Sequence, residues 1–560
     1  FLNEMSFVPG RNLFYGTLLS LFRAWLLVLP LCLRQHDRGG EILAVRIAEA
    51  IYRVFVLSCL GLLSLAESFL LIRFGTPFSF SVIQLLWETD GRESLEFLKT
   101  YCTTPAFLLP AAACVLLTAG YLLAEHRKIR FELHSRKVRI SLLFLLAGSG
   151  AFYVSRLHFQ YALTRTGDFP GEMMRQTATL TPFERLHTSL FWFRHEFSAE
   201  NAEQLLRTVE IESCSFRSPC IVIIIGESFS KHHSSLYGYP LPTNPRLEER
   251  LRRGELFVFR DVVSPANLTT SVLSNLFSPA SLGSGQSWKD SPLFPALFKK
   301  AGYTTCHLDN QAAGNDYDYH DLGLKALFNA RSTPLLFTVH NENRHPYDLE
   351  LLDDYDRLTS RDDTPELVVF HLMGQHVSYS DRYPKEEAYF TPGDIRREDL
   401  TQQERQVVAD YDNATRYNDQ VVDAILARFT DRDAIAVYLS DHGEEVYDYR
   451  DFFCRSHDLP LTPEVCKYQF EIPFMIWMSD TYRRNRPDVA AQVAGALDRP
   501  FSADDLSHLL LDLAGIRCRW YDPARSLIGE RFDTTRPRPL LMGFEPAGNY
   551  ETIIGRDRKQ

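Results

Sequence analysis

The sequence lacks the basic surface that proteins use to bind nucleic acids. Its 560 residues contain 60 Lys and Arg against 71 Asp and Glu, which gives a formal net charge of -11. No run of Lys or Arg outside the loops of the apolar first part predicts a surface that follows phosphates. The ten cysteines do not have the spacing of zinc fingers, and the chain contains no internal repeat or low-complexity tract. These absences argue against a nucleic-acid partner, a zinc finger and a repeat architecture.

The composition is uneven along the chain. The first part is rich in Leu, Phe, Ala and Val, whereas the remainder carries most of the Asp, Glu, Pro and Asn. A chain of this length is too long for a single hydrophobic core. We therefore predict a transmembrane helical domain over residues 1–165, a polar connector over residues 166–217 and a second domain over residues 218–560.

The first domain contains four apolar segments that are long enough to span a bilayer, which takes about 20 residues. The loops before the second and fourth segments are basic, whereas the loop over residues 74–101 is acidic. The positive-inside tendency places the basic loops in the cytoplasm and everything after the fourth segment outside. This orientation also places the N-terminus outside, which we explain by a first span missing before Phe1. The four segments are Leu13 to Leu33, Ile51 to Ile72, Pro105 to Ala124 and Ile140 to Leu157.

In the second domain, apolar runs typical of strands alternate with amphipathic or polar segments. This alternation predicts an α/β fold with a mostly parallel central sheet and helices on both faces. Helices are expected over Ser291 to Ala301, Thr401 to Arg428 and Ser502 to Gly515. The strand-like runs begin at Ile221, Leu256, Thr304, Leu367, Ile435 and Pro473.

Two of these runs end at residues that can bind a metal. The β-branched run at 221–225 stops before Glu227, and the run at 435–439 stops before Asp441 and His442. A carboxylate at the carboxyl end of a buried strand is costly to desolvate unless it meets a cation. Oxygen ligands together with one imidazole suit Zn²⁺ or Mn²⁺. The sequence therefore predicts that Glu227, Asp441 and His442 share one metal ion.

A hydroxyl-rich segment lies between residues 264 and 278, before an apolar, helix-like run. Ser and Thr at the start of a helix are usually caps, and that role stays open here. Alternatively, one hydroxyl binds the same metal, is deprotonated by it and attacks phosphorus at the positive end of the helix dipole. The candidate hydroxyls are those of Thr269, Thr270, Ser271 and Ser274.

Four motifs in fixed order carry a resemblance to a known family. They are GES followed by LYGYPLPTNP, the threonine-containing segment, HLMGQHVSYSDRYP, and SDHGE with a later His. Together they resemble the membrane-bound phosphoethanolamine transferases of the alkaline-phosphatase and sulfatase superfamily, which modify lipid A or the core sugars of lipopolysaccharide in Gram-negative bacteria. The resemblance covers nearly the whole chain.

The resemblance implies a monomeric, multi-pass enzyme of the bacterial inner membrane with a periplasmic catalytic domain. Such an enzyme would transfer phosphoethanolamine from phosphatidylethanolamine to a lipid-linked glycan acceptor, either lipid A or a lipopolysaccharide core sugar. The transfer would pass through a phospho-threonine intermediate and release diacylglycerol. The implied cofactor is Zn²⁺ in preference to Mn²⁺.

The resemblance also implies roles for individual residues. Glu227, Asp441 and His442 match the zinc ligands of the family. Thr269 matches the nucleophilic threonine, which is a further zinc ligand, and the Phe277-Ser278 pair favours it over Thr270. His376 matches the histidine that contacts the phosphoryl group or a second zinc, and His457 matches the histidine that follows the Asp-His pair. Both are implied to serve in catalysis and substrate binding.

The membrane domain matches the family less completely. Thr89 and Glu93 match positions near the lipid head group, and they are four residues apart on one helix face. Leu85 stands where the family often has Asn, and no Lys follows Asp309 and Asn310 as it does in many lipid A enzymes. The cysteines are also fewer than in those enzymes. These departures favour a core-sugar or more divergent subgroup.

Two other functions stay open from the sequence. A glycerophosphate transferase of the lipoteichoic-acid-synthase type has the same ligands and a threonine, and it prefers Mn²⁺. A catalytically inactive membrane scaffold would use the second domain only for binding. A sulfatase is disfavoured because the Cys/Ser-X-Pro-X-Arg context of formylglycine does not occur around Thr269.

Other reactive side chains near these motifs are expected to take no part in the chemistry. His371 is expected to be structural, and His232 and His233, just beyond GES, to lie at the surface. Two pairs of cysteines are close enough in sequence to form disulfides in an oxidising compartment, and free buried thiols are the alternative. These pairs are Cys214 with Cys220 and Cys454 with Cys466.

Overall fold

The computed structural model describes most of the second domain and part of the first. The described ranges are residues 43–74, 101–126, 205–311, 331–360, 364–456, 460–543 and 545–556, with isolated residues between them. Thr89, Glu93 and His457 lie outside the described residues. The chain divides into two compact units, Phe1–Phe193 and Arg194–Gln560.

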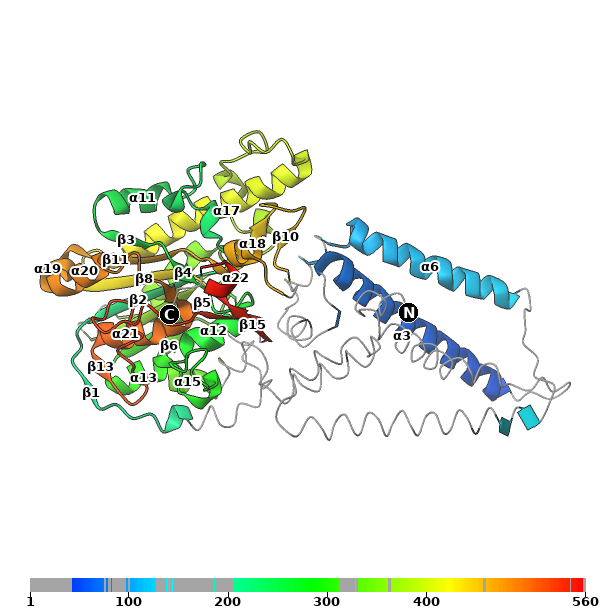
Figure 1. Cartoon of the computed structure of the whole chain (residues 1–560), viewed down its shortest axis with the longest axis horizontal. Helices are drawn as coiled ribbons and strands as arrows, with labels where there is room; N and C mark the ends of the chain where they lie inside the picture. The colour runs from blue at the N-terminus through cyan, green and yellow to red at the C-terminus, as the bar shows by residue number, and fades with distance from the viewer. Residues whose placement is uncertain are drawn as a thin grey trace. The chain divides into compact units, whose positions relative to one another are not determined.

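In the first unit, the described ranges contain two long helices, α3 (Leu43–Phe74) and α6 (Pro105–His126). They cover the segments predicted at 51–72 and 105–124, and the Cys114 thiol of α6 donates to the Gly61 carbonyl of α3 at 3.7 Å (Figure 1). Within the described part of the chain, no helix is both long and apolar enough to cross a membrane. Apart from isolated residues, the segments predicted at 13–33 and 140–157 lie outside the described ranges.

The second unit is built on a seven-stranded sheet with the order β3-β11-β8-β2-β7-β5-β6. Strands β8, β2, β7, β5 and β6 run parallel, whereas β11 is antiparallel to both β8 and the edge strand β3, so β3 runs in the direction of the other strands. All six predicted runs are strands, so the prediction of a mostly parallel sheet is confirmed. The bounds are β2 Cys220–Gly226, β3 Leu256–Phe259, β5 Thr304–Asp309, β6 Val339–His340, β7 Glu366–His371, β8 Ala434–Ser440 and β11 Phe474–Met478.

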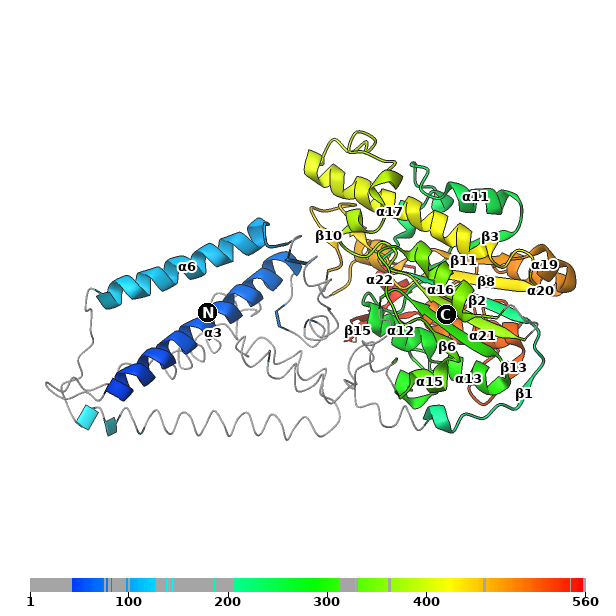
Figure 2. The same cartoon turned by 180° about the vertical axis from the view of Figure 1, so that it is seen from behind.

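Helices cover both faces of the sheet, as predicted. Alternate residues of a strand point to opposite faces, so Ile223 of β2 packs with α12, α13 and α21, whereas Ile224 packs with α11, α16 and α17. Figures 1 and 2 show α11 and α17 on one side of the sheet and α13 and α21 on the other. The bounds are α11 Pro245–Arg252, α12 Thr269–Phe277, α13 Phe294–Ala301, α16 Leu351–Leu358, α17 Gln402–Ala427 and α21 Leu506–Ala514.

Local sequence sets the ends of the predicted helices. Thr401 caps α17 by accepting from the Glu404 backbone, and the Glu404 carboxylate accepts from the Thr401 backbone in return. The third predicted helix, α21, ends at Gly515, where φ is 69° and an added Cβ would collide with the Ser215 hydroxyl. The predicted boundaries therefore lie within a few residues of those observed.

Shorter elements complete the second unit. The hairpin of β9 (Glu445–Val446) and β10 (Phe453–Cys454) follows β8 in the chain. The remaining elements are β1 Ser213–Cys214, β4 Val262–Val263, α15 Thr333–Leu336, α18 Pro463–Val465, α19 Asp480–Asn485, α20 Pro487–Ala494, β12 Phe501–Ser502, β13 Ile516–Arg517, β14 Pro539–Met542, β15 Glu545–Asn549 and α22 Tyr550–Ile553.

The cysteines of the second unit are free thiols throughout the described residues, including both pairs considered for disulfides. Cys220 is buried, and its thiol donates to the Glu366 carboxylate at 3.2 Å. The free-thiol alternative is therefore the one that the structure supports.

Candidate metal centre

The two strands that carry the predicted ligands are direct neighbours in the sheet. β2 and β8 run parallel with Gly226 opposite Ser440, so the chain leaves the sheet at Glu227 and at Asp441 side by side. The Asp441 backbone N–H donates to the Gly226 carbonyl at 2.9 Å, which extends the pairing by one residue. Parallel pairing therefore brings together two carboxylates that are far apart in the sequence.

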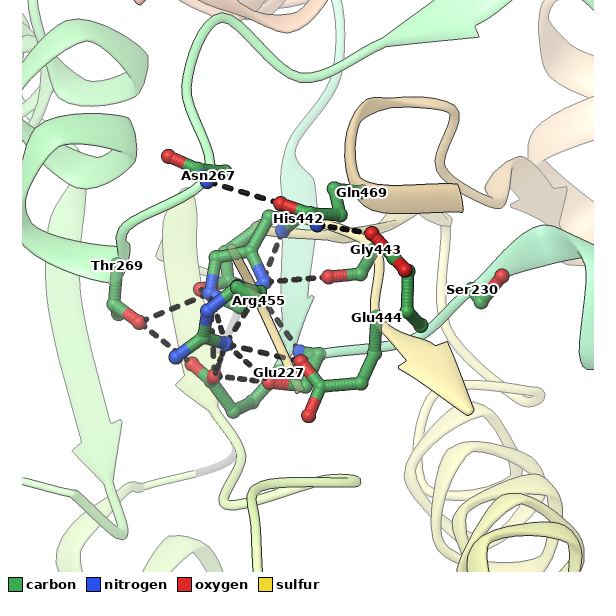
Figure 3. Close-up of polar contacts among 12 residues, drawn as sticks. Glu227, Ser230, Asn267, Thr269, His442, Gly443, Glu444, Arg455 and Gln469 are labelled. Carbon is green, nitrogen blue, oxygen red and sulfur yellow. Dashed lines mark hydrogen bonds and ion pairs between the residues drawn. The ribbon is translucent and has the colours of Figure 1, made fainter. Parts of the chain in front are cut away.

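The three predicted ligands converge. One oxygen of Glu227, one of Asp441 and a ring nitrogen of His442 all lie within 4.8 Å of one another. His442 Nε2 is 3.0 Å from Asp441 Oδ2 and 3.4 Å from Glu227 Oε1 (Figure 3). All three side chains have no exposed surface. Asp441 Oδ2 is buried and accepts no hydrogen bond within the described residues.

Thr269 joins this cluster from a third element, since it is the first residue of α12. Its hydroxyl donates to Glu227 Oε2 at 3.1 Å and lies 3.3 Å from His442 Nε2 (Figure 3). The hydroxyl of Thr270 is buried and has no partner within the described residues. Leu268 is the N-cap and offers no side-chain oxygen, so Thr269 is not a cap and its hydroxyl belongs to the cluster.

Two glycines allow the backbone to approach this closely. At Gly374, where φ is 48°, an added Cβ would lie 2.8 Å from both the backbone N and the backbone O of Glu227. At Gly443, an added Cβ would collide with the Tyr468 carbonyl oxygen. The Gly443 N–H also donates to the Gln469 carbonyl at 2.9 Å, which fixes the turn after His442.

The protonation state of the His442 imidazole is that of a metal ligand. Burial and the Arg455 guanidinium together lower the pKa of His442 to about 3, although the charge of Glu227 opposes the shift, so the ring is neutral. Nδ1 lies 3.0 Å from the Gly443 carbonyl oxygen and can only donate to it, which leaves a lone pair on Nε2. That lone pair faces the two carboxylates.

The donor types and their spacing around His442 Nε2 fit a bound Zn²⁺ ion. Bonds of about 2.0–2.1 Å in a tetrahedron place neighbouring ligand atoms about 3.3–3.4 Å apart. His442 Nε2 lies 3.0 Å from Asp441 Oδ2, 3.3 Å from Thr269 Oγ1 and 3.4 Å from Glu227 Oε1, whereas Thr269 Oγ1 lies 3.1 Å from the other Glu227 oxygen, Oε2. The unpartnered oxygen of Asp441 supplies the further acceptor that a cation requires.

His376 lies in the turn after β7, close to this cluster. Its backbone N–H donates to the Met373 carbonyl at 3.1 Å, and its Nδ1 is buried with no partner within the described residues. Burial lowers the pKa of His376 to about 3, although the negative charge of Glu227 opposes the shift. His371 at the end of β7 is buried and bonds to Asp309 of β5 at 3.1 Å. This contact agrees with the structural role predicted for His371.

Two members of the cluster were missed from the sequence. Gln311, two residues beyond β5, donates to Glu227 Oε2 at 3.0 Å and to the Leu372 carbonyl at 2.8 Å. Its position just beyond a strand end was the signal that could have identified it. Arg455 lies against Glu227 and His442 and follows β10, where no pattern in the sequence indicates a site.

The prediction that His233 lies at the surface is wrong. His233 is buried, with Nδ1 2.8 Å from Asp412 and Nε2 3.2 Å from Asp448. The Tyr239 hydroxyl donates to the other oxygen of Asp412 at 2.8 Å. His232 is partly exposed and contacts Glu471 at 3.2 Å. The polar sequence around His233 suggested exposure, because its two carboxylate partners, Asp412 and Asp448, are distant in the chain.

The second unit matches a known protein family over most of its length. Residues 219–516, which make up more than half of the chain, match the sequence profile named Sulfatase. The chain belongs to the sulfatase family. The sequence-based resemblance to this superfamily is therefore confirmed, as is its α/β domain with a mostly parallel sheet.

Within the sulfatase family, the chain is similar to curated proteins and to solved structures. It is 28% identical to phosphoethanolamine transferase EptC of Escherichia coli O18:K1:H7 over 496 residues, covering 84% of this chain and 82% of that protein. It is 27% identical over 490 residues to phosphoethanolamine transferase CptA of Salmonella typhimurium, with the same coverage. The resemblance to phosphoethanolamine transferases is thus confirmed.

Two solved structures extend this similarity to three dimensions. The C-terminal periplasmic domain of EptC from Escherichia coli, in a complex with Zn, is 29% identical, covers 61% of this chain and 95% of its own, and has a TM-score of 0.52. The integral membrane protein lipooligosaccharide phosphoethanolamine transferase A from Neisseria meningitidis covers 94% of each chain with a TM-score of 0.62. At 18% identity, this second structure supports the fold alone.

Proposed function

We propose that the chain transfers phosphoethanolamine from phosphatidylethanolamine to lipid A or to a lipopolysaccharide core sugar through a phospho-threonine on Thr269. The observation that carries the proposal is the convergence of Glu227, Asp441, His442 and the Thr269 hydroxyl within one buried cluster. Relatives that are named phosphoethanolamine transferases cover more than four fifths of this chain, which supports the assignment of the transferred group.

The cofactor in this proposal is Zn²⁺, held by Glu227, Asp441, His442 and Thr269. The donor set and its spacing support zinc, and so does the Zn complex of the related EptC domain. A bound zinc ion acts as a Lewis acid, which lowers the pKa of a coordinated hydroxyl and offsets charge on a phosphoryl oxygen.

The residues of the chain prepare Thr269 for attack on phosphorus. Its hydroxyl donates to Glu227 at 3.1 Å, and its position at the start of α12 lets the helix dipole stabilise negative charge on Oγ1. Diacylglycerol then leaves, and an acceptor hydroxyl or phosphate attacks the phospho-threonine in the second half of the reaction. His376 is neutral, so it would donate a hydrogen bond to the phosphoryl group rather than supply a positive charge.

The proposal also covers the arrangement of the whole chain and the residues outside the described ranges. We assign residues 1–165 to the inner membrane, residues 166–217 to a connector and residues 218–560 to a monomeric periplasmic domain. Thr89 and Glu93 would bind the head group of the donor, and His457 would contact the phosphoryl group. A membrane domain has a physical purpose in this reaction, because the donor lipid is costly to remove from the bilayer.

The phospho-threonine provides the decisive test. The purified full-length chain is incubated with phosphatidylethanolamine in lipid nanodiscs without acceptor, and peptides are examined by mass spectrometry for phosphoethanolamine on Thr269. Thr269→Ala should form no adduct. Thr270→Ala is the matched control and should form it, because the neighbouring hydroxyl has no partner within the described residues. A full yield of adduct in Thr269→Ala would refute the assignment.

The acceptor requires a separate assay. Head-group transfer from labelled phosphatidylethanolamine is measured against purified lipid A and against core oligosaccharide. The departures from the lipid A enzymes at Leu85 and after Asn310 favour transfer to the core fraction. If the adduct forms but neither acceptor receives the head group, the proposal is limited to the first half-reaction.

A further inference from the structure

The guanidinium of Arg455 lies among the residues proposed to bind zinc. Nη1 lies 2.9 Å from His442 Nε2 and 3.6 Å from Glu227 Oε1, and it donates to the Ser228 hydroxyl at 2.8 Å (Figure 3). Glu444 Oε2 lies 3.4 Å from the same nitrogen. The side chain of Arg455 is only 10% exposed. A fixed positive charge is therefore buried beside the candidate metal centre.

Part of the guanidinium of Arg455 makes no hydrogen bond within the described residues. Every hydrogen bond that Arg455 makes within the described residues comes from Nη1. Nε is buried and has no partner there. A buried donor without an acceptor costs free energy, so unpaired N–H groups beside a reaction centre indicate a ligand with acceptor oxygens. The fork of N–H groups in arginine matches the oxygens of a phosphate.

The backbone on both sides of Arg455 is fixed in place. Cys454 has a φ of 83°, a left-handed conformation that is unfavourable for a residue with a Cβ, and it pairs with Glu445 at the end of the β9-β10 hairpin. On the other side, the Asn267 amide donates to the Ser456 carbonyl at 3.0 Å. Asn267 belongs to the segment that leads into α12. The segment that carries the nucleophile therefore also holds the arginine.

The contacts of Arg455 do not resemble those of a purely structural ion pair. Arg450, in the same hairpin, contacts Glu445 through two nitrogens at 2.7 Å each. Arg455 approaches Glu227 and Glu444 through one nitrogen only, at 3.6 and 3.4 Å. Charge-assisted bonds are usually about 2.7–2.9 Å long. The other N–H groups of Arg455 can therefore donate to a further anion.

We propose that Arg455 is a catalytic residue that binds the non-bridging oxygens of the phosphoryl group during its transfer to Thr269. The inference rests on the proposed function, because that function supplies a phosphodiester donor. In the transfer, Thr269 loses its hydroxyl proton and Oγ1 bonds to phosphorus. The bond from phosphorus to the glycerol oxygen breaks, and that oxygen takes up a proton. Arg455 forms no covalent bond, but its charge stabilises the negative charge that grows on the non-bridging oxygens.

The test compares Arg455→Gln with Arg450→Gln in the full-length, zinc-loaded chain. The rate of adduct formation on Thr269 is measured in a single turnover, together with bound zinc and thermal unfolding. Arg455→Gln should form the adduct about 10²–10³-fold more slowly. Bound zinc and the unfolding temperature should stay close to the wild-type values. Arg450→Gln, whose arginine is partly exposed and contacts Glu445, should stay within about twofold of the wild-type rate.

A chemical rescue separates the catalytic role from a structural one. Arg455→Ala leaves room for a free guanidinium ion, and added guanidinium at non-denaturing concentration should raise its rate of adduct formation. An adduct formed at the wild-type rate by Arg455→Gln would overturn the role of Arg455 and leave the proposed function intact. A rate that falls only in proportion to lost zinc would overturn it equally. No adduct on the wild-type chain would overturn the proposed function and this inference together.

Discussion

Two buried polar clusters each contain a residue of the segment after β2, and they differ in how completely their groups are paired. In the first, His233 contacts Asp412 at 2.8 Å and Asp448 at 3.2 Å, and Tyr239 donates to Asp412 at 2.8 Å. In the second, the candidate metal centre, Asp441 Oδ2 is buried without accepting a hydrogen bond in the described structure. Buried charge alone therefore does not mark a site. The paired cluster stabilises the fold, and the incompletely paired one can accept a ligand.

Glu227→Gln removes a ligand from the candidate metal centre and should have the largest effect. We expect loss of bound zinc and a fall of at least about 10³-fold in transfer, because a catalytic metal contributes several kcal/mol. Metal analysis and a head-group transfer assay measure both. Stability without metal should change little, since Glu227 lies beside both the like charge of Asp441 and the opposite charge of Arg455. Retention of zinc and activity would remove Glu227 from the ligand set.

Asp412→Asn breaks the paired cluster instead. It leaves the charge of His233 with one carboxylate, and breaking such a buried pair should lower the free energy of unfolding by about 3 kcal/mol. Zinc content should not change. Denaturant unfolding measures the effect, and Asp498→Asn is the control, because its ion pair with Arg260 is largely exposed and should contribute less than about 1 kcal/mol. Equal effects of the two substitutions would contradict the comparison.

Gly374→Ala tests how tightly the backbone packs around Glu227. The added Cβ would lie 2.8 Å from two backbone atoms of Glu227, at a φ of 48°. We expect a loss of about 2 kcal/mol in stability together with weaker zinc binding. Gly254→Ala is the control for φ alone, because its φ is 70° and no atom lies within 4 Å of the new Cβ. It should cost about 1 kcal/mol and leave zinc binding unchanged.

The most gradual effect is that of pH on stability. Burial alone would lower the pKa of His233, but the carboxylates of Asp448 and Asp412 raise it to about 10. The proton of the folded state therefore stabilises the protein fully below the unfolded pKa of about 6.5, and this stabilisation is lost as pH rises to about 10. In that window the loss is at most about 1.4 kcal/mol per pH unit. Unfolding temperatures of the wild type should fall more steeply with pH than those of His233→Asn, and parallel curves would contradict the assignment.

Much of the fold could be predicted from the sequence. The runs at 221–225 and 435–439 are strongly apolar and β-branched, and such buried parallel strands leave a clear signal. β6 was missed because two residues, Val339–His340, carry no periodicity. The reversed direction of β11, which is antiparallel to both β8 and β3, was also not predicted, because strand direction depends on the path of the chain and not on local composition.

The candidate site was predictable where its residues follow strand ends. Glu227, Asp441 and His442 converge as expected, and the structure places the hydroxyl of Thr269, not Thr270, beside them. Arg455 was missed because an arginine in a polar loop usually points to solvent. Its burial comes from the hairpin and from Asn267, which contacts Ser456 across 189 residues of sequence. Long-range contacts of this kind leave no local pattern.

The pairing of β2 with β8 makes the centre a late product of protein synthesis. Ser228 and Asp441 are in contact although 213 residues separate them in the chain. A nascent chain that ends before β8 contains Glu227 and Thr269 but lacks Asp441 and His442, so it cannot bind an ion in the proposed way. Metal uptake would thus report that β8 has joined the sheet, and its binding free energy would favour molecules that contain β8 over shorter ones.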